Sequence, residues 1–281
     1  MVKKIKIERF AGTLLRRIIL IAALLFVLVP FLYFVSVSFQ SKNYIEGNKS
    51  FFYSFLHPTF ENYIQVFSTL SYFRYFKNSL IICVISTVFS VIVASLASYV
   101  LSRIKNDFTD NLAFWILSQK MLPPIAILIP IYLILSKIRL LDTYTGIILI
   151  YTVVNLPYSV WMIKSFIDDV PVEEDESAML DGCNKLQILT KIIYPIAKPG
   201  IIATGIFIFI LSWSEFIFAL ILTSMHTKTL PVAISSFVTD TGIEWNCMAA
   251  AGTILVIPLI IMFVFIQKSL VRGLSFGAVK G

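Results

Sequence analysis

Six apolar runs, each long enough to cross a lipid bilayer, dominate this sequence of 281 residues. A helix needs roughly 20 consecutive apolar residues to span the hydrocarbon core. Charged residues make up only 14% of the chain, whereas soluble domains usually carry about 25%. The sequence therefore predicts an all-α integral membrane protein with six transmembrane helices. The predicted spans are residues 18–39, 79–102, 112–135, 145–163, 201–222 and 249–266.

Lys and Arg in the connecting segments predict the orientation, because cytoplasmic segments carry an excess of both. With the N-terminus inside, the inner segments hold fifteen of these residues and the outer segments hold seven. We therefore expect both termini in the cytoplasm. The predicted division is a cytoplasmic N-terminus (1–17), a first transmembrane helix (18–39), an extracytoplasmic segment (40–78) and a five-helix core (79–281) that includes a cytoplasmic loop (164–200).

Several chemistries are not expected of this chain. Its net charge of +7 comes from short basic loops, so it does not indicate a nucleic-acid partner. Cys83, Cys183 and Cys247 are far apart and are read as free thiols, and His57 and His226 are isolated. No phosphate-binding G-x-x-x-x-G-K-[ST] pattern occurs. The sequence therefore predicts no enzyme, no metal site and no cofactor held by this chain.

Internal prolines interrupt several of the predicted spans, and each removes one helix hydrogen bond. Two readings are open: a structural kink, or a broken helix that lines a cavity, where irregular backbone finds water or protein partners. The prolines are Pro30, Pro123, Pro124, Pro130, Pro157 and Pro258.

One loop concentrates the acidic residues of the chain, with seven of sixteen falling in fourteen positions. Pro171 and the acids after it suit the start of a helix. Gly182 permits a sharp turn, and Asn184 with Gln187 resembles a capping box for a second helix. We expect helix, glycine turn and helix, with Pro195 and Pro199 ending the second helix before the fifth span. The seven acids are Asp168, Asp169, Glu173, Glu174, Asp175, Glu176 and Asp181.

This loop has an apolar side as well as its acids. Leu186, Leu189 and Ile193 fall on one face of the second helix, and a short element cannot bury such a face alone. Anionic lipids of the inner leaflet would repel the acids, which favours a groove in a partner protein over the membrane surface. The alternative is a solvated loop.

The same stretch resembles the "EAA" loop of binding-protein-dependent ABC transporter permeases. The loop reads Glu176-Ser177-Ala178, three residues, Gly182, nine residues, and then Ile192-Ile193-Tyr194-Pro195, with Ser177 and Tyr194 departing from the usual Ala and Leu. Stretches such as "LPPIAILIPIYLILSK", "SWSEFIFALILTS" and "QKSLVRGLSFGAVKG" extend the resemblance over residues 60–281. The chain resembles the smaller, MalG-like permease subunit of carbohydrate (maltose-type) importers.

The resemblance implies the ABC importer permease fold, a place in the inner (plasma) membrane of a prokaryotic cell, and a set of partners. These are membrane lipid, a second, MalF-like permease, two ATPase subunits that bind the ATP, and an extracytoplasmic sugar-binding protein. Residues 171–195 would then couple the spans to the ATPase. Glu176 and Asp181 would make polar contacts there, while Ala178, Leu186 and Leu189 would fill its groove. The loop residues implied are Glu176, Ser177, Ala178, Asp181, Gly182, Leu186, Leu189, Ile192 and Pro195.

Polar residues in or near the spans are candidates for a substrate path, with helix packing as the competing interpretation. These candidates are Asn155, Trp213 and Glu215. Lys120 lies inside the third span and is expected to extend back to the inner interface, against the alternative of a role in the path. A secondary transporter would more often show paired intramembrane acids, and an intramembrane enzyme a nucleophile and base at one depth.

Overall fold

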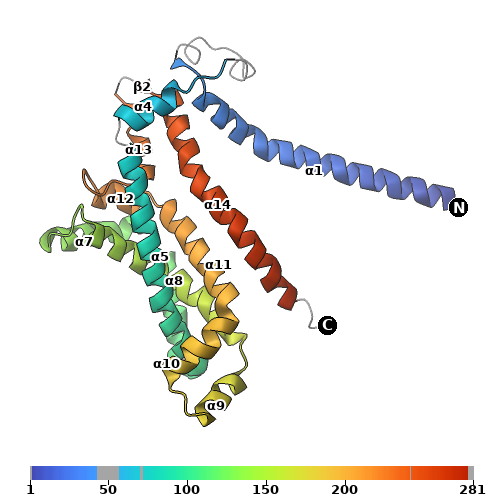
Figure 1. Ribbon diagram of the computed structural model, residues 1–281, viewed down its shortest axis with the longest axis vertical. Coiled ribbons are helices and arrows are strands. Elements are labelled where there is room, and N and C mark those ends of the chain that lie inside the picture. Colours follow the sequence, from blue (N-terminus) through green and yellow to red (C-terminus); the bar gives the residue numbers. More distant parts are fainter. Residues whose placement is uncertain (1, 43–56, 70–71, 241, 278–281) are drawn as a thin grey trace. The chain divides into compact units, whose positions relative to one another are not determined.

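The computed structural model describes residues 2–42, 57–69, 72–240 and 242–277. Their side chains are described as well, except for those of residues 2–11, 69 and 266–277. The described chain is almost entirely helical (Figure 1). Its elements are α1 (Val2–Ser38), α4 (Glu61–Thr69), α5 (Tyr72–Arg103), α6 (Asp107–Ser118), the 3-10 turn η1 (Gln119–Met121), α7 (Pro124–Lys137), α8 (Tyr144–Asp168), α9 (Val172–Leu180), α10 (Lys185–Ile188), the π-helix η2 (Leu189–Ile193), α11 (Tyr194–Trp213), α12 (Ile217–Leu222), α13 (Leu230–Ser235), β1 (Val238–Thr239), β2 (Gly242–Ile243) and α14 (Trp245–Gly277).

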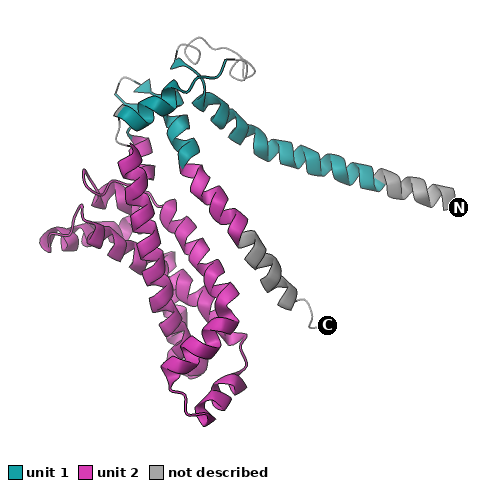
Figure 2. Cartoon of the chain, in the orientation of Figure 1, with its two compact units in different colours: residues 1–71, 236–254 teal, residues 72–235, 255–281 magenta. Residues whose placement is uncertain are grey.

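The chain divides into two compact units, coloured separately in Figure 2. The first comprises residues 1–71 and 236–254, and the second comprises residues 72–235 and 255–281. Helix α14 begins in the first unit and continues in the second. Because the acidic loop and most predicted spans belong to the second unit, that unit positions the candidate site.

Helices α5 and α8 form the centre of the second unit, and α11 packs against both. The buried face of α5 is rich in serine, a small residue that lets helix backbones approach closely. Ser98 donates a hydrogen bond to the Val160 carbonyl at 2.9 Å, and Ser90 donates one to the Thr152 carbonyl at 3.2 Å. These interhelical bonds satisfy hydroxyl groups inside an otherwise apolar helix pair.

Predicted spans one, two, four and six correspond to continuous helices, which are α1, α5, α8 and α14. The third span differs, because α6 and α7 meet at an angle of 95°. The break contains Pro123 and Pro124, which cannot donate the backbone hydrogen bonds that would continue α6. Five described helices are long and apolar enough to cross a membrane, or six if this bent pair counts as one span.

The fifth span also differs from the prediction. Pro195 and Pro199 do not end the loop's second helix, since α10, η2 and α11 run on without interruption from Lys185 to Trp213. The π-helix just before Pro195 absorbs the missing N–H, as one wider turn often does inside a long helix. The predicted end at Leu222 is also displaced, because the helix stops at Trp213 and α12 is a separate element.

In the first unit, the end of α1 is tied to α4. The Asn62 amide on α4 donates to the carbonyls of Ser38 and Gln40, both at 2.8 Å. Asn246, in the first turn of α14, donates to the same Gln40 carbonyl at 3.2 Å. The antiparallel pair of β1 and β2 directly precedes α14. Part of the predicted extracytoplasmic segment, residues 43–56, lies outside the described residues.

Candidate functional site

The acidic loop folds as two short helices joined by a glycine turn, which confirms the predicted local structure. Helix α9 carries Glu173, Glu174 and Asp175 in its first turn, where the helix dipole favours negative charge. Gly182 follows with a φ of +83°, a conformation that side chains with a Cβ rarely adopt. The predicted capping box is present, because Asn184 and Gln187 each accept a hydrogen bond from the other's backbone N–H at 2.9 Å.

One acid of the loop turns inward instead of facing solvent. The Asp175 side chain is 2% exposed and accepts hydrogen bonds from the Tyr99 hydroxyl at 2.8 Å and from two nitrogens of Arg103 at 3.0 and 3.1 Å. Arg103 also donates to the carbonyls of Ile167 and Val170, at the end of α8 and just after it. The loop is therefore fastened to α5 and α8. Sequence analysis missed this contact, because only the fold brings Arg103 to the loop.

Two apolar residues of the loop are also buried within the chain. Ala178 is 4% exposed and Leu189 is 2% exposed, and both belong to a core cluster with Tyr99 and Ile163. In this conformation their side chains pack among the chain's own helices, and a role in filling a partner groove stays a prediction. The exposed apolar surface of the loop comes from other residues, such as Leu180, which is 90% exposed.

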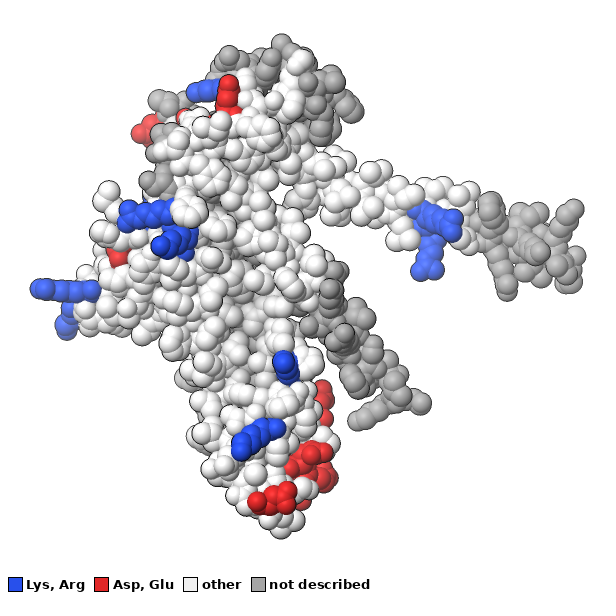
Figure 3. Space-filling model, viewed as in Figure 1, with Lys and Arg blue, Asp and Glu red and all other residues white. Residues whose placement is uncertain are grey.

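The remaining loop residues lie mostly on the outside. Figure 3 shows acidic side chains gathered at the end of the second unit that carries α9. Leu186 is 61% exposed, so the loop presents carboxylates together with exposed apolar side chains such as Leu180 and Leu186. Ile192 is half-buried. The exposed residues from the predicted set are Glu176, Ser177, Asp181, Gly182, Leu186 and Pro195.

The three candidate path residues all have partners inside the chain. The Asn155 amide is buried and donates to the Ser212 hydroxyl at 2.9 Å. Trp213 is 1% exposed, and its indole N–H donates to the Leu255 carbonyl at 2.9 Å. Glu215 accepts hydrogen bonds from two backbone N–H groups at the start of α12. These contacts are those of helix packing, and a transport role for the three residues stays a prediction.

Lys120 packs against an aromatic ring of α8, and its expected extension to the inner interface stays a prediction. Its ammonium nitrogen lies 4.6 Å from the centroid of the Tyr158 ring on α8, next to the break between α6 and α7. Tyr158 in turn meets the Phe207 ring of α11 edge to face, with 6.1 Å between the ring centroids. The structure thus places a cation against an aromatic pair beside a broken helix.

At the other end of α8, a carboxylate holds a loop by its backbone. Asp142 accepts hydrogen bonds from the N–H groups of Ser224, His226 and Thr227 at 2.8, 3.0 and 3.0 Å, and from the Thr227 hydroxyl at 2.9 Å. Partial burial alone would raise the pKa of Asp142, but these hydrogen bonds outweigh it and hold the pKa below its ordinary value. Sequence analysis did not single out Asp142, because the groups that donate to it lie some eighty residues away.

The comparison with known families decides what kind of protein carries this loop. Residues 86–276 match the family described as "Binding-protein-dependent transport system inner membrane component". The chain belongs to this family. The matched range contains the helix–glycine–helix loop, α6, α7 and α8, and it makes the chain a multi-pass permease subunit of the inner membrane.

Curated relatives cover most of this permease. It is 36% identical over 275 residues to the trehalose/maltose transport system permease protein MalG of Thermococcus litoralis, a match that covers 95% of this chain and 98% of that one. It is 33% identical to the diacetylchitobiose uptake system permease protein DasC of Streptomyces coelicolor, with 79% of this chain and 81% of that one covered.

A solved structure supports the permease fold. The permease superimposes with a TM-score of 0.77 on a chain of a bacterial ABC transporter involved in the import of the acidic polysaccharide alginate. The match covers 92% of this chain and 96% of that chain, at 22% identity, so it concerns the fold alone.

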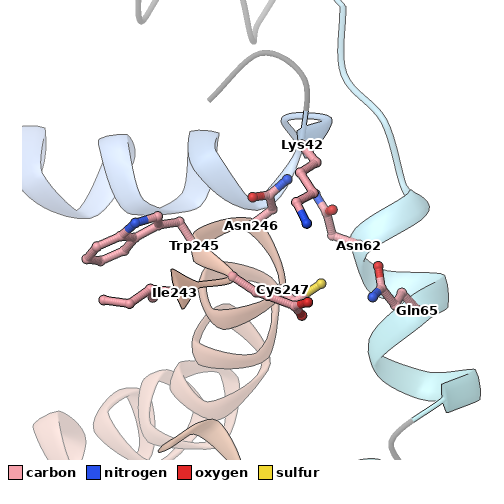
Figure 4. A pocket seen from close by; sticks show the side chains of 8 residues that line it. Lys42, Asn62, Gln65, Ile243, Trp245, Asn246 and Cys247 are labelled. Carbon is pink, nitrogen blue, oxygen red and sulfur yellow. The ribbon is translucent and has the colours of Figure 1, made fainter. Parts of the chain in front are cut away.

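The first unit of the permease contains a small cavity of about 120 Å³ (Figure 4). Asn62 and Asn246, which line it, already donate their amide hydrogens to backbone carbonyls, so these side chains act in the fold. In the described part of the chain, no group of three or more His, Cys, Asp or Glu residues could hold a metal ion.

Proposed function

We propose that this permease is the MalG-like transmembrane subunit of an ATP-driven sugar importer, and that residues 171–195 couple its helices to a separate ATPase. It would form the translocation path with a second permease, with ATP bound only by the two ATPase subunits. An extracytoplasmic binding protein would deliver the sugar. The relatives named for trehalose, maltose and diacetylchitobiose support the substrate class.

The observation that carries the coupling proposal is the form of the loop. Two capped helices with a turn at Gly182 present exposed Glu176, Asp181 and Leu186, while the opposite side is buried against the chain's own helices. Such an element is shaped for a partner groove because its outer side carries both charge and an unpaired apolar group. The excess of Lys and Arg on the same side of the membrane supports a cytoplasmic location, where an ATPase would be.

The anchoring of the loop gives a mechanical route from ATPase to membrane. Asp175 joins α9 to Arg103 at the end of α5, and η2 joins α10 directly to α11. A displacement of the loop would therefore carry the ends of three membrane helices with it, as one packed body. Closure of the ATPase pair on ATP could in this way change which side of the membrane the path faces.

The test is co-purification of the tagged chain from membranes that contain the whole transporter. We expect a second permease and an ATPase to be recovered with it. Leu186→Asp should reduce ATPase recovery at least tenfold while the second permease stays bound, because it places a charge in the proposed apolar contact. Lys105→Asp, an exposed change in the connection between α5 and α6, is the control and should leave recovery within twofold.

Undiminished ATPase recovery with Leu186→Asp would refute docking at this surface. Recovery of the chain alone, without any ATPase in mild detergent, would instead favour a secondary transporter. Transport driven by an ion gradient in liposomes that contain this chain alone would then be the deciding measurement.

A further inference from the structure

The charge of Lys120 lies deep within the membrane-spanning part of the second unit. Thirteen residues separate it from Asp107 at the start of α6, which corresponds to about 20 Å of helix. The hydrocarbon core is only about 30 Å thick. A cation at that depth does not face lipid, because intramembrane charges face protein or a water-filled cavity.

Tyr158 sets the same depth independently. It lies ten residues before the end of α8 at Asp168, about 15 Å along the helix axis. The Lys120 ammonium sits 4.6 Å from its ring centroid, and Lys120 is only partly buried. Among the described residues, no carboxylate forms an ion pair with Lys120. A cation–π contact occupies one side of an ammonium group and leaves donors for another partner.

An aromatic surface continues from this pair toward the inner end of α8. Trp161 lies one helical turn beyond Tyr158 and is 57% exposed. It borders an open groove of about 380 Å³ between α6 and α8, whose lining includes Phe114, Leu117 and Lys164. Residues three apart on a helix share one face, so Tyr158 and Trp161 line one continuous strip.

We propose that Lys120, Tyr158 and Trp161 form a sugar-contacting surface within the translocation path of this subunit. The proposal rests on the sugar-importer function proposed above. Lys120 donates hydrogen bonds to sugar hydroxyl or carboxylate oxygens, and the two aromatic rings pack against the apolar C–H faces of sugar rings. The 95° bend at Pro123 and Pro124 follows Lys120 within a few residues, so α6 and η1 end beside the proposed surface.

The exposed face of α5 at the same depth differs in chemistry. Val93 lies ten residues before the end of α5 and is 43% exposed. Its exposed neighbours along the helix, Phe89, Leu96 and Val100, are all apolar. That face suits lipid, whereas the face with Lys120 combines a charge, two aromatic rings and a groove. Val93 therefore serves as a depth-matched control for the path.

Cysteine labelling tests the position of the path whatever the sugar is. In the assembled transporter, with Cys83, Cys183 and Cys247 replaced, Tyr158→Cys and Trp161→Cys should react with a charged methanethiosulfonate reagent at least tenfold faster than Val93→Cys. The reagent needs water around the thiol, and only a path supplies water at that depth. Equal, slow labelling at all three positions would overturn the proposal.

Uptake tests the contact itself, in liposomes that hold the complete transporter and its binding protein. The probes are radiolabelled trehalose, maltotriose and an alginate trisaccharide. For any probe that the parent transports, Lys120→Met should reduce uptake at least tenfold, and Lys120→Arg should stay within threefold. ATP hydrolysis stimulated by the binding protein should stay within twofold in both variants, which a merely folding-related role of Lys120 would not allow.

Parental uptake by Lys120→Met would overturn the contact. A larger loss for the alginate trisaccharide than for the neutral sugars supports it and adds charge pairing to hydrogen bonding. If the parent transports no sugar while Tyr158→Cys and Trp161→Cys label rapidly, the sugar function fails and the water-filled path stands. The two failures are thus distinguishable.

Discussion

One carboxylate lies just beyond each end of α8, and each ties its own segment to distant sequence in a different way. Asp142, just before α8, binds the backbone N–H groups of residues 224–227. Asp175, beyond the other end of α8, binds the side chains of Tyr99 and Arg103. Backbone bonds fix the shape of a loop, whereas side-chain bonds join one helix to another. The contacts of Asp142 therefore fix the shape of a loop. The contacts of Asp175 with Tyr99 and Arg103, which we call the joint, connect α9 to α5.

The joint should also contribute more to the free energy of unfolding than the contacts of Asp142 do. A buried ion pair is costly to break from one side, because the remaining charge loses its partner without regaining water. Hydrogen bonds from backbone to an accessible carboxylate are individually weaker, because water can replace them. Variants at the two ends should therefore differ in size and in what they disturb.

Breaking the buried pair should produce the largest effect. We expect Arg103→Met to destabilise the chain by about 3–5 kcal/mol, since it leaves the Asp175 carboxylate buried and unpaired. Thermal unfolding of the detergent-purified transporter measures this change. Lys164→Met removes the exposed pair between Lys164 and Asp168 and should cost only about 0.3–0.5 kcal/mol. Similar melting temperatures for the two variants would contradict the assignment of the joint.

Removing the carboxylate at the other end should have a smaller, local effect. Asp142→Ala eliminates four hydrogen bonds. It also places alanine at a backbone φ of +53°, which alanine tolerates less well than aspartate. We expect the free energy of unfolding to fall by about 1–3 kcal/mol. Limited proteolysis should show faster cleavage within residues 223–229. Asp142→Asn keeps the acceptor oxygen and tolerates that backbone, so cleavage there should increase less. Unchanged cleavage in both variants would argue against the tie.

A side chain of any size at Gly182 should strain the turn between α9 and α10. Gly182→Val should cost about 1–2 kcal/mol through backbone strain alone, since open space surrounds the site. We expect the ratio of sugar transported to ATP hydrolysed to fall, because the strain alters the angle between α9 and α10. Gly205→Ala, inside α11 with ordinary contact distances, is the control and should leave that ratio unchanged. Normal sugar uptake by Gly182→Val would show that the turn takes no part in coupling.

Acid should loosen the end held by Asp142, and it should do so at low pH. Its folded-state pKa lies below the ordinary value of about 4, so its contribution is present above that value. The contribution is lost as pH falls further, through the folded-state pKa. After correction for the intrinsic pH dependence of amide exchange, the protection of residues 224–227 should thus change little between pH 7 and 5. Below about pH 4 it should fall relative to that in Asp142→Asn. Loss of protection already at pH 6 would point to another group.

Local rules predicted the acidic loop well, because its signals lie within a few residues. Gly182 and the reciprocal bonds of Asn184 and Gln187 need no tertiary information. Ala178 and Leu189 are buried against helices that are distant in the sequence. An amphipathic pattern shows that a face will be buried, but it does not show whether a partner or the chain's own core covers it. The position of Lys120 was likewise hidden, since a continuous third span was assumed and the break re-aims its side chain.

The π-helix at Leu189–Ile193 has a consequence for motion. It makes Lys185 to Trp213 a single shaft of 29 residues, about 44 Å long. A torque applied to the exposed end at α10 would rotate this helix about its own axis. At the other end of the helix, the Trp213 indole donates a hydrogen bond to the Leu255 carbonyl of α14. Under the proposed coupling, ATPase closure would therefore reach the membrane as a twist as well as a push.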